Sequence, residues 1–162
     1  MTRHLTFNPL TVPRPALALG VAGLIPFVAA SLMTFAGQPE LRPQAAFALA
    51  AYGAVILSLL GGIHWGVAMA ASTGQDGPFE DRELLTRLAI AVAPSLAGWA
   101  GLLLPQTSGL LLLAACFAAM FALDLTASRE GKFPLWYPAL RLPLSAGAAA
   151  SMLLGAAAPS VM

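Results

Sequence analysis

Hydrophobic and polar positions follow one another along this chain in long blocks rather than in a short alternation. Five apolar stretches are separated by short segments that hold most of the charged residues. An α-helix of about 20 residues crosses the roughly 30 Å hydrocarbon core of a bilayer. The pattern therefore predicts one all-α domain over residues 1–162, an integral membrane bundle of five transmembrane helices at residues 16–36, 45–71, 88–104, 110–127 and 139–158.

The segments between these stretches predict how the helices connect. Met1 to Pro15 reads as an irregular segment that ends in a proline-led helix start. Residues 72–87 are the most polar part of the chain, and their glycines and proline indicate a turn-rich loop, with Glu80 to Thr86 able to begin the third helix early. Residues 105–109 form a short turn, so we expect spans three and four to be an antiparallel hairpin.

The first span has a competing interpretation as a signal peptide, because basic residues precede its apolar run. That run is longer than the apolar region of a usual signal peptide. Thr34-Phe35-Ala36 is also a poor cleavage site. We therefore favour a retained span, with Pro26 as a kink within it.

The second span is the one that we expect at the centre of the bundle. Small residues recur in it at every fourth position, a spacing that lets a neighbouring helix approach closely along one row. His64 falls nearly opposite that row at about 100° per residue, so the helix requires protein on both sides. The predicted packing ridge consists of Ala54, Ser58, Gly62 and Gly66.

Composition narrows the function classes. Hydrophobic residues make up 59% of the chain, charged residues 9%, and the mean hydropathy is +0.80. A soluble domain has about 25% charged residues, which excludes an ordinary soluble surface. The net charge of +1 argues against a nucleic-acid partner. A single cysteine, Cys116, provides no disulfide framework.

The distribution of basic residues predicts an orientation. With five spans, the N-terminus and the second and fourth loops share one side of the membrane, and Arg42 alone lies on the other. Basic loops mark the cytoplasmic side, so we expect a cytoplasmic N-terminus and, in a bacterial inner membrane, a periplasmic C-terminus. Seven of the eight basic residues define the predicted cytoplasmic side: Arg3, Arg14, Arg82, Arg87, Arg129, Lys132 and Arg141.

Ionisable groups inside spans are costly and mark candidate functional sites. His64 and Asp124 lie within spans two and four, while Arg87 and Arg141 begin spans three and five. All four fall in the predicted cytoplasmic half. A carboxylate that accepts from an imidazole and a guanidinium would satisfy each group in a low dielectric. We favour interhelical pins over a proton relay or a ligand pocket, because transport paths usually need more than one buried charge.

The sequence gives little support for haem binding, metal binding or catalysis. Haem ligation by two histidines is disfavoured because His4 lies outside the spans. The sequence has no zinc spacing, phosphate loop or nucleophile elbow, so we expect no enzyme activity, no metal and no cofactor beyond a bound lipid or quinone. Trp136 and Tyr137 are aromatic residues of the kind that sit at a membrane interface.

Several motifs together resemble the transmembrane-protein-69-like family, small multi-span proteins of the DUF3429 type in proteobacterial inner membranes and mitochondria. The resemblance covers about residues 16–154. It implies five spans and an energy-converting membrane, and it carries over no catalytic residue. It rests on the segments YGAVILS at 52–58, GGIHWG at 61–66, PS at 94–95, the apolar run that ends in Asp124, PLWY at 134–137 and LRL at 140–142.

Three functions remain in competition on the sequence alone. The first is a non-catalytic accessory or assembly subunit of a larger respiratory or photosynthetic membrane complex, with lipids and other membrane subunits as partners. The second is a quinone-, lipid- or proton-handling protein with a cytoplasmic-side pocket around His64 and Asp124. The third, a transporter dimerised along the Gly62/Gly66 ridge, is the least supported.

Overall fold

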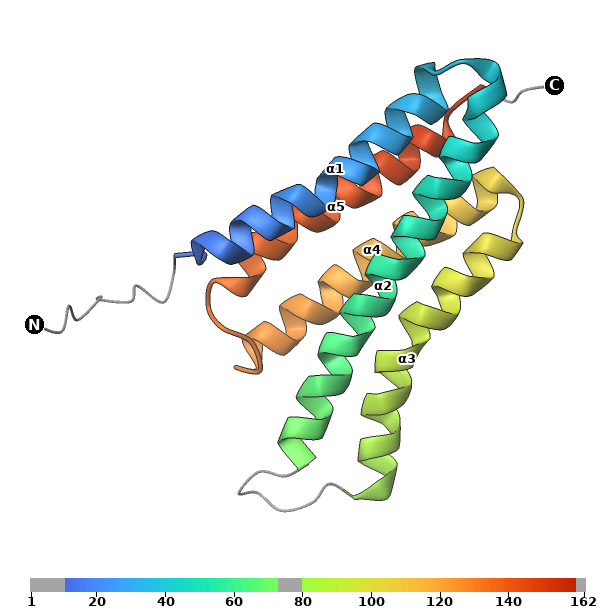
Figure 1. Cartoon of the computed structure of the whole chain (residues 1–162). Coiled ribbons are helices and arrows are strands. Elements are labelled where there is room, and N and C mark those ends of the chain that lie inside the picture. Colours follow the sequence, from blue (N-terminus) through green and yellow to red (C-terminus); the bar gives the residue numbers. More distant parts are fainter. Residues whose placement is uncertain (1–10, 73–79, 160–162) are drawn as a thin grey trace, which may run out of the picture.

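Five long helices and one short 3₁₀ turn make up the regular structure of residues 11–72 and 80–159, the part of the chain that the computed structural model describes (Figure 1). Each long helix is apolar and long enough to cross a membrane, and no strand occurs among the described residues. The all-α, five-span prediction is therefore confirmed. The elements are α1 (Arg14–Ala36), η1 (Pro39–Leu41), α2 (Arg42–Ser72), α3 (Asp81–Leu103), α4 (Gln106–Arg129) and α5 (Tyr137–Ala156).

Most helices extend beyond the spans expected from hydropathy. The largest difference is in α3, which begins at Asp81 rather than at residue 88. Asp81 and Glu83 lie in its first turn, where carboxylates interact favourably with the helix dipole, so the polar residues continue the helix past its apolar part. The irregular segment predicted before Pro15 and the turn-rich loop after Ser72 fall largely outside the described residues.

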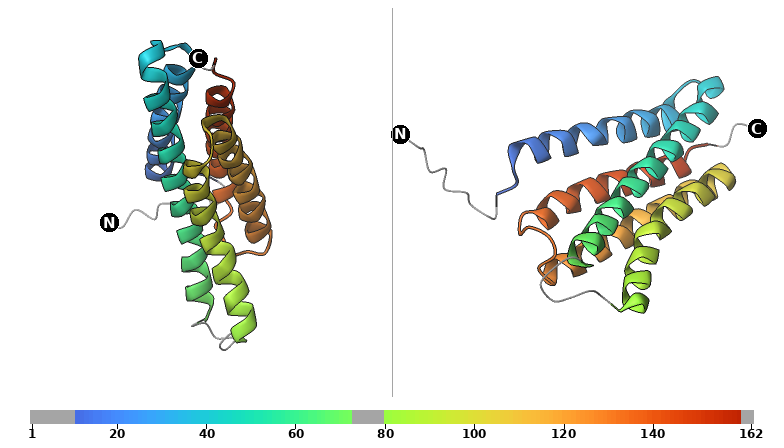
Figure 2. Two further views of the ribbon diagram at one scale, coloured as in Figure 1. Left: turned by 90° about the vertical axis from the view of Figure 1, so that its right-hand side faces the viewer. Right: turned by 60° about the horizontal axis from the view of Figure 1, so that its bottom comes forward.

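The helices pair along their lengths in two groups. The α2–α3 hairpin is one group, and α1, α5 and α4 lie side by side in the other, with α2 also in contact with α1 and α4. The two groups diverge towards the end of the molecule where α1 and α5 begin (Figures 1 and 2). We call this end, with the starts of α1, α3 and α5 and the ends of α2 and α4, the basic end.

A core of large apolar side chains holds the two groups together. Phe27 of α1 meets Phe117 of α4 edge-on, with ring centroids 5.6 Å apart, and Tyr52 of α2 with centroids 4.9 Å apart. The Tyr52 hydroxyl donates to the carbonyl oxygen of Gly23 at 3.1 Å. The α1–α2–α4 contact is thus both apolar and hydrogen-bonded. Fully buried side chains around it are Leu49, Leu57, Leu110, Leu113 and Met152.

The predicted packing ridge of α2 contacts α3 along only part of its length. Ala54 faces the backbone of α3 at Gly98, and the Ser95 hydroxyl of α3 donates to the Ser58 hydroxyl at 3.1 Å. Gly62 and Gly66, by contrast, are exposed, and a Cβ on either would meet nothing within 4 Å. The close contact with α3 is made instead by Gly61, where an added Cβ atom would lie 2.2 Å from the Ala91 carbonyl oxygen.

Candidate polar site between α2, α4 and α5

Asp124 is the centre of the candidate site. It projects from α4 into the bundle and is 1% exposed. Its Oδ1 lies 2.9 Å from Nε2 of His64 on α2, and its Oδ2 accepts from Nε of Arg141 on α5 at 2.6 Å. A carboxylate only accepts hydrogen bonds, so His64 Nε2 carries the hydrogen in this contact. One carboxylate thus joins three helices.

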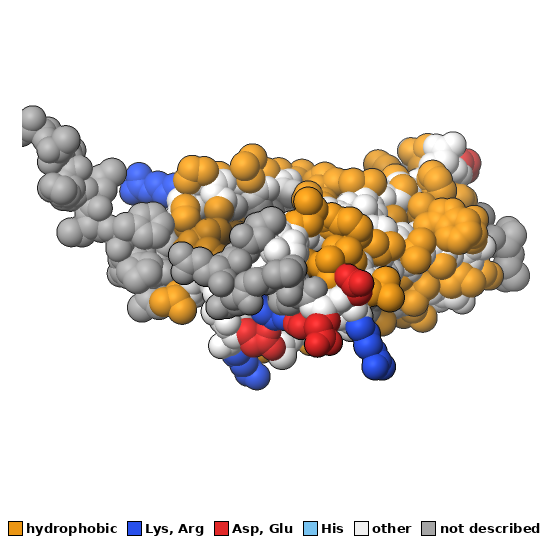
Figure 3. All heavy atoms as spheres, turned by 90° about the horizontal axis from the view of Figure 1, so that it is seen from below, with side chains coloured by type: hydrophobic (Ala, Val, Ile, Leu, Met, Phe, Trp, Pro, Cys, Tyr) orange, Lys and Arg blue, Asp and Glu red, His pale blue; other side chains and the backbone are white. Residues whose placement is uncertain are grey.

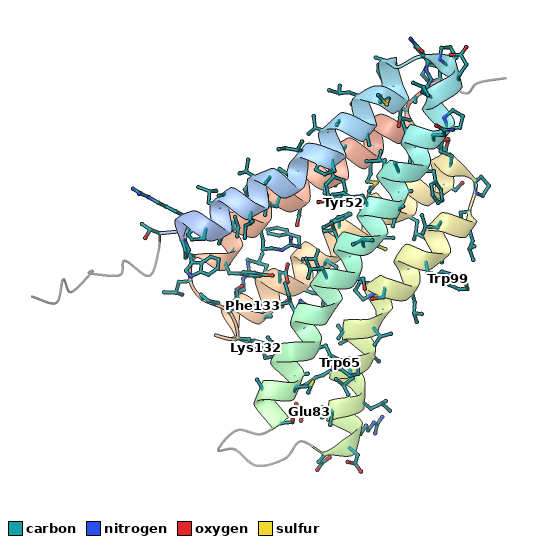
Figure 4. The ribbon with its side chains drawn as sticks, viewed as in Figure 1. Tyr52, Trp65, Glu83, Trp99, Lys132 and Phe133 are labelled. Carbon is teal, nitrogen blue, oxygen red and sulfur yellow. The ribbon has the colours of Figure 1, made fainter. Side chains whose placement is uncertain are left out.

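An aromatic group covers this triad at the basic end. Phe133 meets the His64 ring edge-on at a centroid distance of 5.6 Å, and Tyr137 lies against Phe133 at 4.5 Å. Trp136 contacts Tyr137 in turn. Tyr137, expected at the membrane interface, therefore also packs inward over the site, and Figure 4 shows Phe133 and Lys132 next to α2 at the end of α4.

The end of α4 is what places Phe133 there. Gly131 has a φ of +74°, a backbone conformation that residues other than glycine rarely adopt. The Lys132 amide donates to the Ala127 carbonyl at 3.0 Å and the Gly131 amide to the Ser128 carbonyl at 3.1 Å. This is the hydrogen-bond pair of a Schellman motif, and it turns the chain back towards α2 and α5.

A row of polar atoms on α5 continues from the triad. Tyr137, Arg141 and Ser145 recur at every fourth position and share one helix face. The Tyr137 hydroxyl, Arg141 Nη2 and Ser145 Oγ are buried without a hydrogen-bond partner among the described residues. Buried polar groups normally have a hydrogen-bond partner, so these three atoms retain the capacity to form further hydrogen bonds.

Arg87, the fourth predicted member of the polar cluster, lies outside the triad. Its guanidinium pairs with Glu83 one turn earlier in α3, with Nη2 2.7 Å from Oε1. It nevertheless lines a cavity of about 300 Å³ that His64 also lines, together with Lys132 and Glu130. The structure thus brings His64, Asp124 and Arg141 into contact and leaves Arg87 across a cavity from His64.

The cavity carries charges of both signs. Lys132 pairs with Glu130, and this hydrogen bond is the main reason why the pKa of the Glu130 carboxyl is lowered. Glu130 follows the end of α4 and is exposed to solvent. The cavity is therefore lined by paired charges and by the His64 imidazole, together with apolar side chains such as Val67 and Leu123.

The chemistry open to this arrangement is limited. Both carboxylate oxygens of Asp124 are engaged, so it is not placed to act as a free base. Among the described residues no group of three or more His, Cys, Asp or Glu side chains is placed to hold a metal ion. The arrangement can hold three helices in register, and it can present one imidazole to a molecule in the cavity.

Two parts of the site were not predicted from the sequence. The spacing of four between Arg141 and Ser145 places both on one helix face, but a lone serine in an Ala/Gly-rich helix does not by itself indicate a site. Phe133 and Lys132 belong to the site only because Gly131 reverses the chain, and that depends on a backbone conformation that many loop glycines do not adopt.

Comparisons with known proteins match most of the chain. The family model described as "Protein of unknown function (DUF3429)" matches residues 12–157. Transmembrane protein 69 of Xenopus tropicalis is 36% identical over 146 residues, which cover 87% of this chain and 53% of the relative. Transmembrane protein 69 of Mus musculus is 32% identical over 133 residues, covering 82% and 51%. The chain spans about half the length of the curated relatives it matches. No solved structure matches.

Proposed function

This chain belongs to the DUF3429 family and is a multi-pass membrane protein, and from that premise we propose that it is a non-catalytic accessory or assembly subunit of a larger energy-converting membrane complex. We place it in the bacterial inner membrane, with its N-terminus in the cytoplasm and its C-terminus in the periplasm.

The observation that carries this proposal is the closed triad. Asp124 binds His64 and Arg141 and so joins three helices, which is what a rigid scaffold requires. In the part of the chain that the structure describes, other charged side chains lie near helix ends or in connections. The buried groups thus form no chain across the bilayer of the kind that proton relays use.

A second feature supports a partner in the membrane. In an apolar stretch of 18 residues within each span, only 11% to 39% of the residues are buried inside the protein, and α1 is the least buried. Ile25 and Leu32 on α1 are 65% and 53% exposed. Lipid can cover such a surface, and so can the helices of a neighbouring subunit packed side by side.

The test is purification of the tagged full-length protein from its own membrane in mild detergent, followed by mass spectrometry. We expect stoichiometric subunits of one energy-converting complex. The variant Ile25→Ala/Leu32→Ala should lose them, whereas Val55→Ala/Leu59→Ala on the exposed face of α2 serves as the matched control. Recovery of the protein by itself would refute the proposal.

The cavity beside His64 favours a second function, the handling of a small molecule such as a quinone or lipid, or of a proton. At about 300 Å³ it lies at the lower end of the range of ligand pockets. In that case His64→Ala should abolish function while the protein remains abundant in the membrane. Loss of abundance would instead mean that His64 only holds α2 to α4.

A further inference from the structure

The cavity beside His64 is the middle part of a longer trough. On one side it shares Ile90 and Leu123 with an apolar hollow of about 260 Å³ between α3 and α4. On the other side it shares Arg87 and Lys132 with an open hollow of about 430 Å³ at the start of α3. Shared wall residues make the three hollows adjoining, so one elongated molecule can occupy them together.

The polarity of the trough changes along its length. The apolar section is lined by small and hydrophobic side chains, including Ala93, Ala97, Ala119 and Met120. The outer section is lined by charged side chains, which gather in one small area when the molecule is seen from below (Figure 3). A ligand with an apolar tail and a charged head matches this gradient, and such molecules surround any protein in a bilayer.

The charges of the outer and middle sections balance. Their walls hold three cations (Arg82, Arg87 and Lys132) and three carboxylates (Glu80, Glu83 and Glu130). A head group with net negative charge would meet as many repulsive as attractive partners. A zwitterion can place each charge against its opposite, and a primary ammonium can donate hydrogen bonds to carboxylates, which a quaternary choline cannot do.

We infer that the trough binds a zwitterionic aminophospholipid, with its phosphate between Arg87 and Lys132, its ammonium against Glu83, and one acyl chain between α3 and α4. This inference rests on the second function above and is independent of the accessory role. A quinone ring fits the outer section less well, because its carbonyl oxygens only accept hydrogen bonds and cannot interact with the carboxylates there.

Native mass spectrometry of the purified full chain tests the inference, with mixed micelles that contain equal amounts of dioleoyl phosphatidylethanolamine, phosphatidylcholine, phosphatidylglycerol and a short-chain ubiquinone. We expect phosphatidylethanolamine to be retained about tenfold over the other two phospholipids, the size expected from a charge-assisted hydrogen bond. Glu83→Gln should shift retention towards phosphatidylglycerol. Glu40→Gln, an exposed residue in η1, should leave the preference unchanged.

A second pair of variants tests the apolar section. Ala119 lines it, whereas its exposed neighbour Ala118 does not. Ala119→Phe should fill the hollow and reduce phosphatidylethanolamine retention about tenfold, and Ala118→Phe should have no effect.

The possible results separate the two claims. Equal retention of all phospholipids, or equal effects of the two phenylalanines, would show only a lipid annulus and overturn the inference. Retention of ubiquinone without phosphatidylethanolamine would overturn it while leaving the second function in place. If no small molecule is retained, the inference fails together with the small-molecule form of the second function.

Discussion

At the scale of single residues, Asp124 shows how this protein keeps a charge within a bilayer. A carboxylate out of contact with water loses several kcal/mol of hydration, which good ion-pair geometry can offset. Asp124 has that geometry, with one oxygen for His64 and the other for Arg141. The arrangement is stable only when all three residues are present, because removal of one leaves a buried charge or dipole on another without its partner.

We therefore expect Asp124→Leu to destabilise the protein by about 3–5 kcal/mol, since it leaves Arg141 charged and unpaired in the interior. The double variant Asp124→Leu/Arg141→Met should recover most of that stability, because apolar residues of similar size can replace a buried ion pair at little cost. Thermal unfolding in detergent measures both.

Glu40→Gln is the control for removal of an acid at an exposed position. An unchanged unfolding temperature for Asp124→Leu would show that the triad does not hold the bundle. A double variant that is stable but no longer purifies with its partner subunits would show that the polar groups do more than pack.

At the scale of helices, the sequence predicted which residues of α2 are small but not which of them touch α3. A strict spacing of four advances by about 400°, or 40° past one turn, so the row winds around the helix. After Ala54 and Ser58 it has left the contact line, and Gly62 and Gly66 face outwards. Spacings of three and four combined stay on one face, which is how Gly61 meets α3.

Gly61→Ala should separate α2 from α3 and destabilise the protein, since the added methyl group would lie 2.2 Å from the Ala91 carbonyl oxygen. Gly62→Ala adds the same group where nothing lies within 4 Å. It should be neutral or stabilise by up to about 1 kcal/mol through helix propensity. Unfolding temperatures of the two variants provide the comparison, and similar shifts would contradict the observed α2–α3 contact.

How much of the site was predictable differs from residue to residue. His64, Asp124 and Arg141 stood out because polar groups inside spans are expensive, and that expense drives them to pair. Arg87 was predicted with them for the same reason, but it lies near the start of α3 and pairs with Glu83 one turn away instead of joining the triad. The five helices followed from hydropathy, whereas the way they cross depends on packing between distant segments, which no local pattern reports.

At the scale of the whole molecule, the two ends of the bundle differ in their number of basic residues. Among the described residues, the basic end has Arg14, Arg82, Arg87, Arg129, Lys132 and Arg141, and the other end has Arg42. The same end holds the triad and the charged mouth of the trough. Orientation therefore also decides from which side of the membrane the candidate site is reached.

Thiol labelling of single-cysteine variants measures this orientation directly. Gln38→Cys lies between α1 and α2, and Asp81→Cys begins α3 at the opposite end; both positions are exposed. In a Cys116→Ala background, which removes the native cysteine, a thiol reagent that cannot cross the membrane should label Gln38→Cys in intact cells with a permeabilised outer membrane. It should label Asp81→Cys only after the inner membrane is opened, because translocation of the basic end is disfavoured by its Lys and Arg residues.

The reverse pattern would place the trough mouth in the periplasm and refute the cytoplasmic N-terminus. Labelling of both variants in intact cells would indicate mixed orientations.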